Sequence, residues 1–429
     1  MNTIKKVRSV SARLLSGGPS GIVARFGWAS VTEVLQLVSS VAVFVIVANL
    51  ISQADYGQMS AVLGVAFPTL TLTAFGTHIL LMKRVAQGQD LANAWARATA
   101  IGILGPLVGV AFGVLIVQPY FLSTIDATTF ALLFVSQVSF FWITELATFL
   151  GVGAKRLKDS AQVRLLVVVT RLAGLAVFAV FGRGSLKFWA WSSMISFGVA
   201  AFGAVLMVWN RYGARPSITA VSLQDLREGL PFSVNSGSES LVDSMDRPLL
   251  LNYAGEEDAG VYGLGGRIIQ FGYLPIRILL RASDADVFAA GKDGVASAWR
   301  VTRRQLVKPG IGVGAFVTVG FLVFAPLVPI LVGEKYNEAV PAIRMLAVLP
   351  LIRSVQYLFG NCLSASTHQQ WRTMATIAAV VVNLALNLRL LPNGSWRTAV
   401  GTTLVSELFL ALVLGFMILY LSQKETALP

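Results

Sequence analysis

Twelve mostly apolar stretches, each long enough to cross a bilayer as a helix, run through the chain of 429 residues. In lipid every backbone N–H and C=O group must be bonded within the segment, so such stretches fold as helices. Only 13% of the residues are charged, against about a quarter in a typical soluble domain. The sequence therefore predicts an all-α integral membrane protein. The predicted spans are 29–51, 59–82, 97–117, 128–150, 162–181, 188–209, 226–253, 259–281, 306–332, 339–361, 372–391 and 398–421.

Lys and Arg are distributed unevenly between the loops on the two sides of the predicted membrane. With these spans, 23 basic residues lie on the side of the N-terminus and 5 on the other. Because basic loops stay in the cytoplasm, both termini are expected there, and the net charge of +13 is explained without nucleic acid. The basic N-terminal segment has apolar residues at helical spacing and suits a surface helix on anionic lipid headgroups. A disordered basic leader fits it equally well.

The polar segment NRYGARPSITAVSLQD separates the spans into two sets of six. Only one longer connection, around 282–305, is expected elsewhere. The predicted organisation is an N-terminal cytoplasmic segment at 1–28, a six-helix bundle at 29–210, a cytoplasmic linker at 211–225, a second bundle at 226–421 and a cytoplasmic tail at 422–429.

Charged residues also occur within the spans, where each costs a few kcal/mol unless it faces protein or water. All six basic residues there are arginines, whose guanidinium fork matches phosphate oxygens. They are Arg171, Arg247, Arg267, Arg277, Arg344 and Arg353, and the acids are Glu33, Glu145, Glu239, Asp243, Asp246 and Glu407. Two interpretations remain open: each arginine neutralises a nearby acid, or some of them bind an anionic ligand. Arg267 and Arg277 are the leading candidates for the second role.

The seventh span is the most polar. Glu239, Asp243 and Asp246 are spaced i, i+4 and i+7, which places them on one stripe of a continuous helix. Arg247 lies four residues after Asp243, at the spacing of an intrahelical ion pair. Such a helix is expected to line an aqueous cavity. In the first bundle, Glu33 and Glu145 could bind H⁺ or Na⁺ and couple transport to an ion gradient; a polar clamp between helices is the alternative.

Sequence features of an enzyme are missing. The chain has no G-x-x-x-x-G-K-[ST] phosphate loop, no G-x-S-x-G and no H-E-x-x-H, and the predicted outer loops are short. One cysteine and two histidines far apart in sequence do not provide a metal centre. We therefore expect a protein that moves a substrate, without a cofactor or a bound metal.

The run LPFSVNSGSESLVDSMDRPLLLNYAGEEDAGVYGLGGRIIQFGYLPIRIL resembles the middle of bacterial polysaccharide transporters, the O-antigen flippase branch of the multidrug/oligosaccharidyl-lipid/polysaccharide (MOP) exporter superfamily. The matching positions are Pro231-Phe232, Asp246 and Gly260-Val261-Tyr262. The stretches ANLISQADYGQMSAVLG and LVGEKYNEAVPAIRMLAVLP agree with it as well. The resemblance implies two six-helix bundles in a V around a central cavity, and movement of undecaprenyl-pyrophosphate-linked sugars across the bacterial inner membrane.

Expected roles follow from the resemblance together with the polar residues. Arg267, Arg277 and Arg247 would contact pyrophosphate; Asn235, Ser236 and Gln270 would hydrogen-bond sugars; Glu239, Asp243 and Asp246 would hold or gate the arginines. The expected partners are the lipid-linked oligosaccharide, membrane lipids, and the polysaccharide polymerase and glycosyltransferases of the same pathway. Two alternatives remain: an ion-coupled multidrug exporter of the same superfamily, and a non-transporting membrane scaffold for glycan-synthesis enzymes.

Overall fold

The computed structural model describes residues 19–218, 221–366 and 368–426. These residues are almost entirely helical, and no strand occurs among them. The helices of the first half are α2 (Pro19–Leu50), α3 (Gln53–Thr73), α4 (Thr77–Ala86), α5 (Leu91–Phe112), η1 (Gly113–Val117), α6 (Gln118–Phe121), α7 (Ala127–Val135), η2 (Ser136–Phe141), α8 (Trp142–Gly153), α9 (Leu157–Phe181) and α10 (Leu186–Tyr212).

The second half has the same all-helical character. Its helices are α11 (Leu223–Ser244), α12 (Asp246–Ala254), α13 (Glu256–Phe271), α14 (Tyr273–Gly291), α15 (Val295–Gln305), α16 (Val307–Phe324), η3 (Ala325–Leu327), α17 (Val328–Val332), η4 (Glu334–Tyr336), α18 (Ala339–Leu346), α19 (Leu349–Ala365), α20 (Gln369–Leu390), η5 (Leu391–Asn393) and α21 (Trp396–Thr426). The longer loop expected around 282–305 is instead helical over most of its length, because α14 extends to Gly291 and α15 follows.

The all-helical membrane architecture is confirmed. Within the described ranges, eight helices are long and apolar enough to span a bilayer, and α3 with α4 makes a ninth if the pair, bent by 43°, counts as one span. Two predicted spans look different. The seventh and eighth spans are each broken into two helices, at Met245 and Gly272, and carry the charges noted above.

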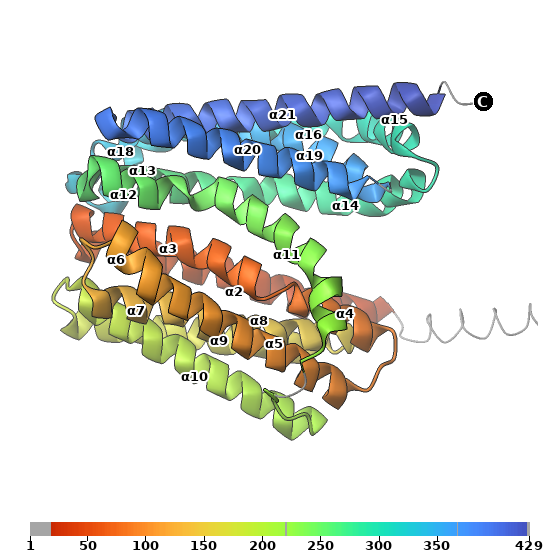
Figure 1. Ribbon diagram of the computed structural model, residues 1–429, viewed down its shortest axis with the longest axis horizontal. Coiled ribbons are helices and arrows are strands. Elements are labelled where there is room, and N and C mark those ends of the chain that lie inside the picture. Colours follow the sequence, from red (N-terminus) through yellow and green to blue (C-terminus); the bar gives the residue numbers. More distant parts are fainter. Residues whose placement is uncertain (1–18, 219–220, 367, 427–429) are drawn as a thin grey trace, which may run out of the picture.

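The two halves form two lobes that contact each other at one end (Figure 1). We call residues 19–212 the N-lobe, residues 223–426 the C-lobe, and this end the closed end. There α3 packs along α12 and α13. Gln53 Nε2 donates to the Glu257 carbonyl at 3.1 Å, and Gln58 Nε2 to Glu256 Oε1 at 2.7 Å. Lys335 Nζ donates to the Asn49 carbonyl at 2.9 Å.

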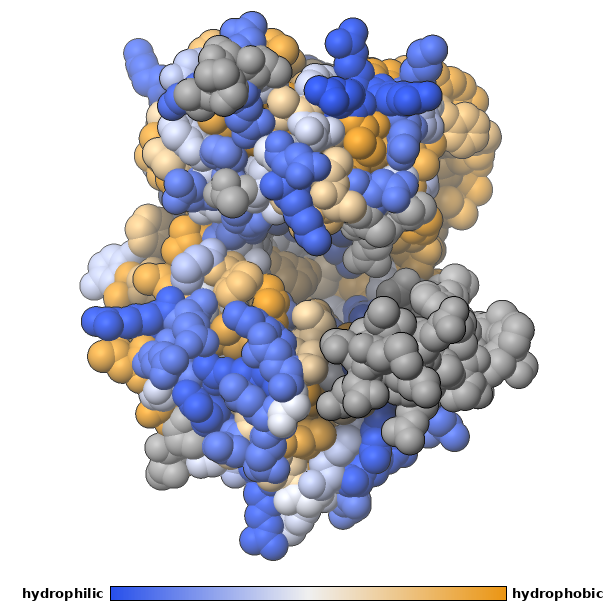
Figure 2. Space-filling view, turned by 90° about the vertical axis from the view of Figure 1, so that its right-hand side faces the viewer, coloured by the Kyte–Doolittle hydropathy of each residue, from blue (hydrophilic) through white to orange (hydrophobic). Residues whose placement is uncertain are grey.

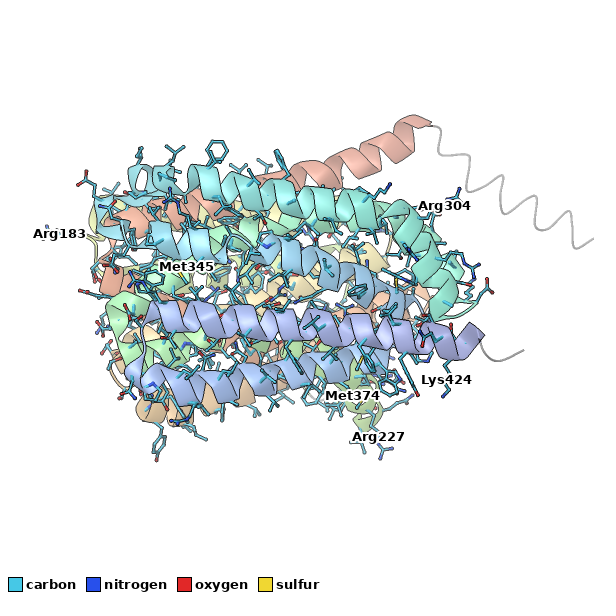
Figure 3. The ribbon with its side chains drawn as sticks, turned by 90° about the horizontal axis from the view of Figure 1, so that it is seen from above. Arg183, Arg227, Arg304, Met345, Met374 and Lys424 are labelled. Atoms are coloured by element: carbon cyan, nitrogen blue, oxygen red, sulfur yellow. The ribbon has the colours of Figure 1, made fainter. Side chains whose placement is uncertain are left out.

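The opposite end, which we call the open end, is hollowed between the lobes (Figure 2). Arg227, Arg304 and Lys424 lie at this end and Arg183 lies at the closed end (Figure 3). These three residues at the open end are among those that the charge pattern of the loops assigns to the cytoplasmic side. The space between the two lobes is therefore open at one end and closed at the other.

Helix α11 crosses from one lobe to the other. Its first turn is held to the N-lobe by Asp225, which is 1% exposed and forms ion pairs with Arg84 and Arg97. Desolvation raises the pKa of Asp225, but hydrogen bonds from the two arginines outweigh it and the net pKa is lowered. Further along, Ser233 Oγ donates to the Thr71 carbonyl at 2.8 Å. The crossing helix therefore stays attached to the N-lobe while its second half lines the C-lobe.

Gly57 is where the closed end is most sensitive to substitution. A Cβ there would stand 2.0 Å from the Glu256 carbonyl oxygen, so α3 and α13 approach closely only because the residue is glycine. Gly57→Val is expected to disfavour the closed contact by about 1–3 kcal/mol, roughly a 5- to 150-fold population shift. To measure this shift, cysteines are introduced by Asn49→Cys and Lys335→Cys, and the yield of their cross-linking by a short bismaleimide is compared between variants. The native Cys362 is buried and should not compete for the reagent.

Gly312→Val is the matched control, because a Cβ at Gly312 meets no atom within 4 Å. Cross-linking should fall in Gly57→Val and stay at the parental level in Gly312→Val. Equal yields in the two variants would contradict the close packing of α3 on α13.

Candidate functional site

A cavity of about 230 Å³ lies between the lobes, next to the closed end. It draws side chains from both lobes, so its shape depends on how the lobes are placed. Its polar lining is Gln36, Ser40, Ser60, Gln137, Ser193, Ser196, Arg171, Arg247 and Arg267, and its apolar and aromatic lining includes Phe44, Tyr56, Phe141, Trp189 and Phe197. We call it the inter-lobe cavity.

Three arginines supply the charge of this cavity. Arg171 comes from α9 in the N-lobe, and Arg247 and Arg267 come from α12 and α13 in the C-lobe. Among the residues whose side chains the structure describes, no Asp or Glu lines the cavity and none of the three arginines forms an ion pair. The buried Nε of Arg247 has no hydrogen-bond partner. The cavity is therefore cationic, with donor capacity left unused.

Weak neutral contacts hold these guanidinium groups. Arg267 Nη1 donates to Gln270 Oε1 at 3.3 Å and its guanidinium lies 5.5 Å from the Phe271 ring centre. Arg171 lies 5.4 Å from the Phe197 ring centre. Cation–π contacts orient a guanidinium without neutralising it. An anionic ligand bearing several oxygens would supply the missing acceptors and relieve repulsion among the arginines.

The N-lobe wall of this cavity contains an irregular helix. In the fourth span, η2 is a π-helical segment, and it carries both Gln137 and Phe141. π-helical segments leave the regular ladder and are frequent at functional sites. Here the segment brings an amide and an aromatic ring to the cavity opposite the arginines of the C-lobe.

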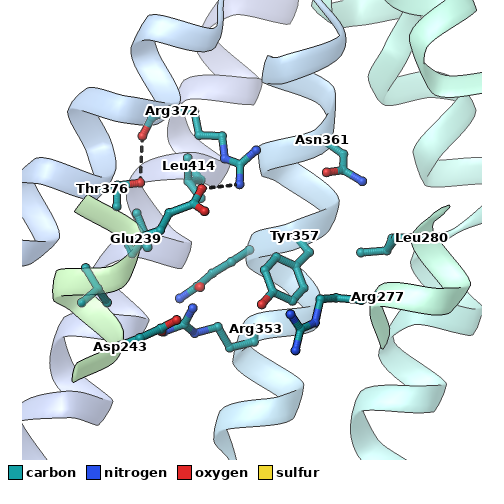
Figure 4. Close-up of a pocket in the computed structure, with 13 residues that line it drawn as sticks. Glu239, Asp243, Arg277, Leu280, Arg353, Tyr357, Asn361, Arg372, Thr376 and Leu414 are labelled. Atoms are coloured by element: carbon teal, nitrogen blue, oxygen red, sulfur yellow. Dashed lines mark hydrogen bonds and ion pairs between the residues drawn. The ribbon is translucent and has the colours of Figure 1, made fainter. Parts of the chain in front are cut away.

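A second cavity, of about 360 Å³, lies inside the C-lobe among α11, α14, α19, α20 and α21 (Figure 4). We call it the C-lobe cavity. Arg353 is buried there and forms ion pairs with Asp243 and with Glu407, which is 1% exposed. Arg372 Nη2 donates to Glu239 Oε1 at 2.7 Å. Charges in this cavity are thus mostly paired.

Arg277 lies in the C-lobe cavity and not with Arg267. Its exposed guanidinium points into the space beside Tyr357 (Figure 4). The three arginines expected to contact pyrophosphate, Arg267, Arg277 and Arg247, therefore do not line one cavity, and a phosphate contact by Arg277 stays a prediction. The break at Gly272 separates α13 from α14 and directs the two ends of the eighth span to different cavities.

The expected acidic stripe of the seventh span is also divided. Glu239 and Asp243 line the C-lobe cavity. Asp246 does not, but it lines a small neighbouring cavity together with Asp243, and it accepts from Tyr262 Oη and Asn387 Nδ2, both at 2.7 Å. The helix breaks at Met245, so the i, i+4, i+7 rule does not carry across it. For the same reason the predicted Asp243–Arg247 pair is wrong, and Asp243 pairs with Arg353.

The three residues predicted to bind sugar are also separated. Asn235 Oδ1 accepts from Thr373 Oγ1 at 3.0 Å, in a contact between α11 and α20. Neither Asn235 nor Ser236 lines either cavity. Gln270 accepts from Arg267 and lines a small cavity of about 30 Å³ between the two larger ones.

The predicted ion-coupling residues lie in the N-lobe. Glu145 is partly buried on α8, where Arg164 is the opposite charge that acts on it. The side chain of Glu33 lies outside the described part of the chain. For the two residues, the role in ion coupling stays a prediction.

Arg171 is the cavity residue that sequence reasoning did not select. It belonged to the six arginines at membrane depth, and the argument that made Arg267 a candidate applies to it as well. Because the fifth span has far fewer polar residues than the seventh and eighth spans, the polar pattern of the sequence pointed to those two. Only the folded arrangement brings α9 opposite α12 and α13.

Comparison with protein families gives a match to the family described as polysaccharide biosynthesis protein, over residues 22–274, more than half of the chain. Comparison with curated proteins gives no match. These residues include Arg171, Arg247 and Arg267, the three cationic residues of the inter-lobe cavity.

Solved membrane transporters have the same fold. An inward-facing multidrug resistance MATE family transporter of the MOP superfamily has a TM-score of 0.76 at 16% identity, covering 92% of this chain and 96% of that chain. An outward-facing one has a TM-score of 0.65 at 15% identity, covering 97% and 99%. A MOP superfamily transporter from Pyrococcus furiosus, described as having a binding pocket of reverse polarity, has 0.65 at 16%, covering 97% and 98%. The two-bundle fold predicted from the sequence is therefore confirmed.

Proposed function

The chain belongs to the polysaccharide biosynthesis protein family, and from that premise we propose that it is a flippase for a polyprenyl-pyrophosphate-linked oligosaccharide. It would work in the bacterial inner membrane with both termini in the cytoplasm, by opening its cavity to each side in turn. Its fold is that of MOP superfamily transporters, not of enzymes.

The observation that carries the proposal is the cluster of Arg171, Arg247 and Arg267 in a cavity whose described lining residues include no carboxylate. A pyrophosphate diester brings two negative charges and several acceptor oxygens into one small volume. Three guanidinium groups from two lobes complement it in charge and in hydrogen-bond geometry. The polyprenyl chain would stay in lipid, because apolar chains gain nothing by entering a polar cavity.

The placement of the cluster supports alternating access. Arg171 lies on the N-lobe and the other two arginines lie on the C-lobe, so separating the lobes would pull the phosphate ligands apart. A bound pyrophosphate would instead favour arrangements in which the three remain close. Transport would then proceed by population shift, since the ligand stabilises the states it bridges.

Multidrug transport is supported by the fold alone. The drugs expected for an ion-coupled multidrug exporter are cationic, and three unpaired arginines at the lobe interface would repel them. We therefore place the lipid-linked glycan first. A role for Glu33 and Glu145 in H⁺ or Na⁺ coupling, and association with the polymerase and glycosyltransferases, are further parts of the proposal.

Depletion of the protein in its host tests the assigned class of function. A lipid-linked oligosaccharide should accumulate with its glycan on the cytoplasmic side, and the surface polysaccharide should fall, because synthesis continues while translocation stops. Mass spectrometry of extracted lipids measures the first effect. Unchanged lipid-linked intermediates together with increased sensitivity to cationic drugs would favour the multidrug exporter instead.

A further inference from the structure

A groove on the surface of the C-lobe lies at the open end, where Arg304 and Lys424 are seen in Figure 3. It has a volume of about 620 Å³ and shares no lining residue with the inter-lobe cavity or the C-lobe cavity. Its lining includes Trp299, Arg300, Arg303 and Arg304 of α15, Lys308 in the first turn of α16, and Ser422 near the end of α21. We call it the α15 groove.

Helix α15 is amphipathic. Its buried stripe has helical spacing and consists of Val295, Ala298 and Thr302. The three arginines of this helix lie on the exposed face. A short helix with an apolar stripe on one side and arginines on the other is typical of helices that lie in the interface of a membrane.

Contacts with α19 and α21 hold α15 in place. Glu425, in the last turn of α21, accepts from the backbone N–H of Val295 at 3.0 Å and from that of Ala296 at 2.8 Å. The Trp299 ring lies 5.4 Å from the Phe359 ring, between the two ring centres. The groove is therefore formed by helices that are fixed to one another, and the Glu425 carboxylate bonds to backbone rather than to the arginines.

The charge of the α15 groove is not neutralised within the protein. Among the side chains that the structure describes, no Asp or Glu lines the groove. In the same part of the chain, Arg300, Arg303, Arg304 and Lys308 form no ion pair. Four cations that share one groove repel one another, and an anion with several oxygens would reduce this repulsion and supply acceptors.

Apolar surface continues from the groove along two helices. Beyond Lys308, α16 begins the candidate span with the smallest buried share, 17%, and exposes Ile311 and Phe316. Before Ser422, α21 exposes Phe416 and Leu419. A ligand with an anionic head and long apolar chains would match the groove and these surfaces together, whereas a free anion would match only the groove.

We propose that the α15 groove binds the headgroup of an anionic phospholipid, with the three arginines of α15 and Lys308 as partners of its phosphate. The acyl chains lie against the exposed apolar surfaces of α16 and α21. In the orientation proposed above, the lipid belongs to the cytoplasmic leaflet. The inference goes beyond the proposed function, because this lipid is bound at the outer surface of the C-lobe and is not the transported substrate.

Lipid binding to the purified full-length protein in detergent tests the proposal. The probes are dioleoyl phosphatidylglycerol and dioleoyl phosphatidylcholine, which have the same acyl chains and differ in headgroup charge. Native mass spectrometry gives the Kd of the first bound lipid. Wild-type protein should bind phosphatidylglycerol more tightly. Combining Arg300→Gln, Arg303→Gln and Arg304→Gln should weaken phosphatidylglycerol binding roughly tenfold or more, and leave phosphatidylcholine binding unchanged.

The matched control combines Lys83→Gln, Lys155→Gln and Lys158→Gln, which removes three positive charges from exposed positions of the N-lobe. It should bind phosphatidylglycerol as the wild type does. All six replaced side chains are exposed, so both triple variants should keep the wild-type melting temperature.

Three results would overturn the proposal. The first is unchanged phosphatidylglycerol binding in the α15 variant. The second is an equal loss in the control variant, which would show that net charge alone attracts the lipid. The third is displacement of phosphatidylglycerol by an equal concentration of inorganic phosphate, which would show a site for free anions. Replacing the three arginines of α15 by lysine should preserve most of the preference for phosphatidylglycerol, because the charge is retained.

Discussion

Arg171→Ala, Arg247→Ala and Arg267→Ala are each expected to weaken pyrophosphate binding by roughly 10- to 150-fold, the range for a hydrogen bond to a charged group. Each removes one of three guanidinium groups from a cavity that has no Asp or Glu among the lining residues described by the structure. Calorimetry in nanodiscs measures the affinity, and export of the glycan in cells measures the consequence. Variants that combine two of these substitutions should lose export completely, because one remaining arginine cannot bind both phosphates.

Arg344→Ala is the matched control. Arg344 also lies within a predicted span, but it is exposed and lines neither cavity. Its replacement should leave affinity and export at the wild-type level. Arg171 is the most informative of the three, because it alone belongs to the N-lobe. If Arg171→Ala bound and exported normally, the phosphate site would be confined to the C-lobe and the link between binding and lobe movement would be wrong.

Arg353→Ala is expected to destabilise the C-lobe by about 3–5 kcal/mol, the cost of leaving a buried charge without its partner. Glu407, at 1% exposure, has Arg353 as its ion-pair partner, and Gln356 donates to it at 2.7 Å. Loss of Arg353 leaves this carboxylate with an amide as its hydrogen-bond partner. Thermal unfolding in detergent, followed by tryptophan fluorescence, measures the change in stability.

Two comparisons test the cause. Arg353→Leu with Glu407→Leu should recover much of the lost stability, because replacing a buried pair by apolar residues removes both charges together. Arg372→Ala should cost only about 0–1 kcal/mol, since its partner Glu239 is 41% exposed and remains hydrated. A double variant as unstable as Arg353→Ala would show that Arg353 acts through packing and not through charge.

The length of the apolar stretches was sufficient to predict the helices, because a helix is the way for a single segment in lipid to satisfy its own backbone hydrogen bonds. It failed at Met245 and Gly272, where the seventh and eighth spans break. Spacings such as i, i+4 and i+7 place side chains on one face only in an unbroken helix, and a break changes the direction of the side chains that follow it. The positions of Asp246 and Arg277 were therefore mispredicted, although their presence at membrane depth was correctly interpreted as a need for protein or water contact.

The sequence by itself determined the class of this protein: an all-helical, two-bundle membrane transporter whose arginines had to avoid lipid. The free-energy cost of removing water from backbone and charged groups sets these features, and this cost is determined within each segment. Only the tertiary structure decided which arginines share a cavity. Arg171, Arg247 and Arg267 are brought together by the packing of the two lobes. Arg353, in contrast, forms ion pairs with Asp243 and Glu407. Such pairings depend on distances across helices, and residue spacing along the chain does not encode them.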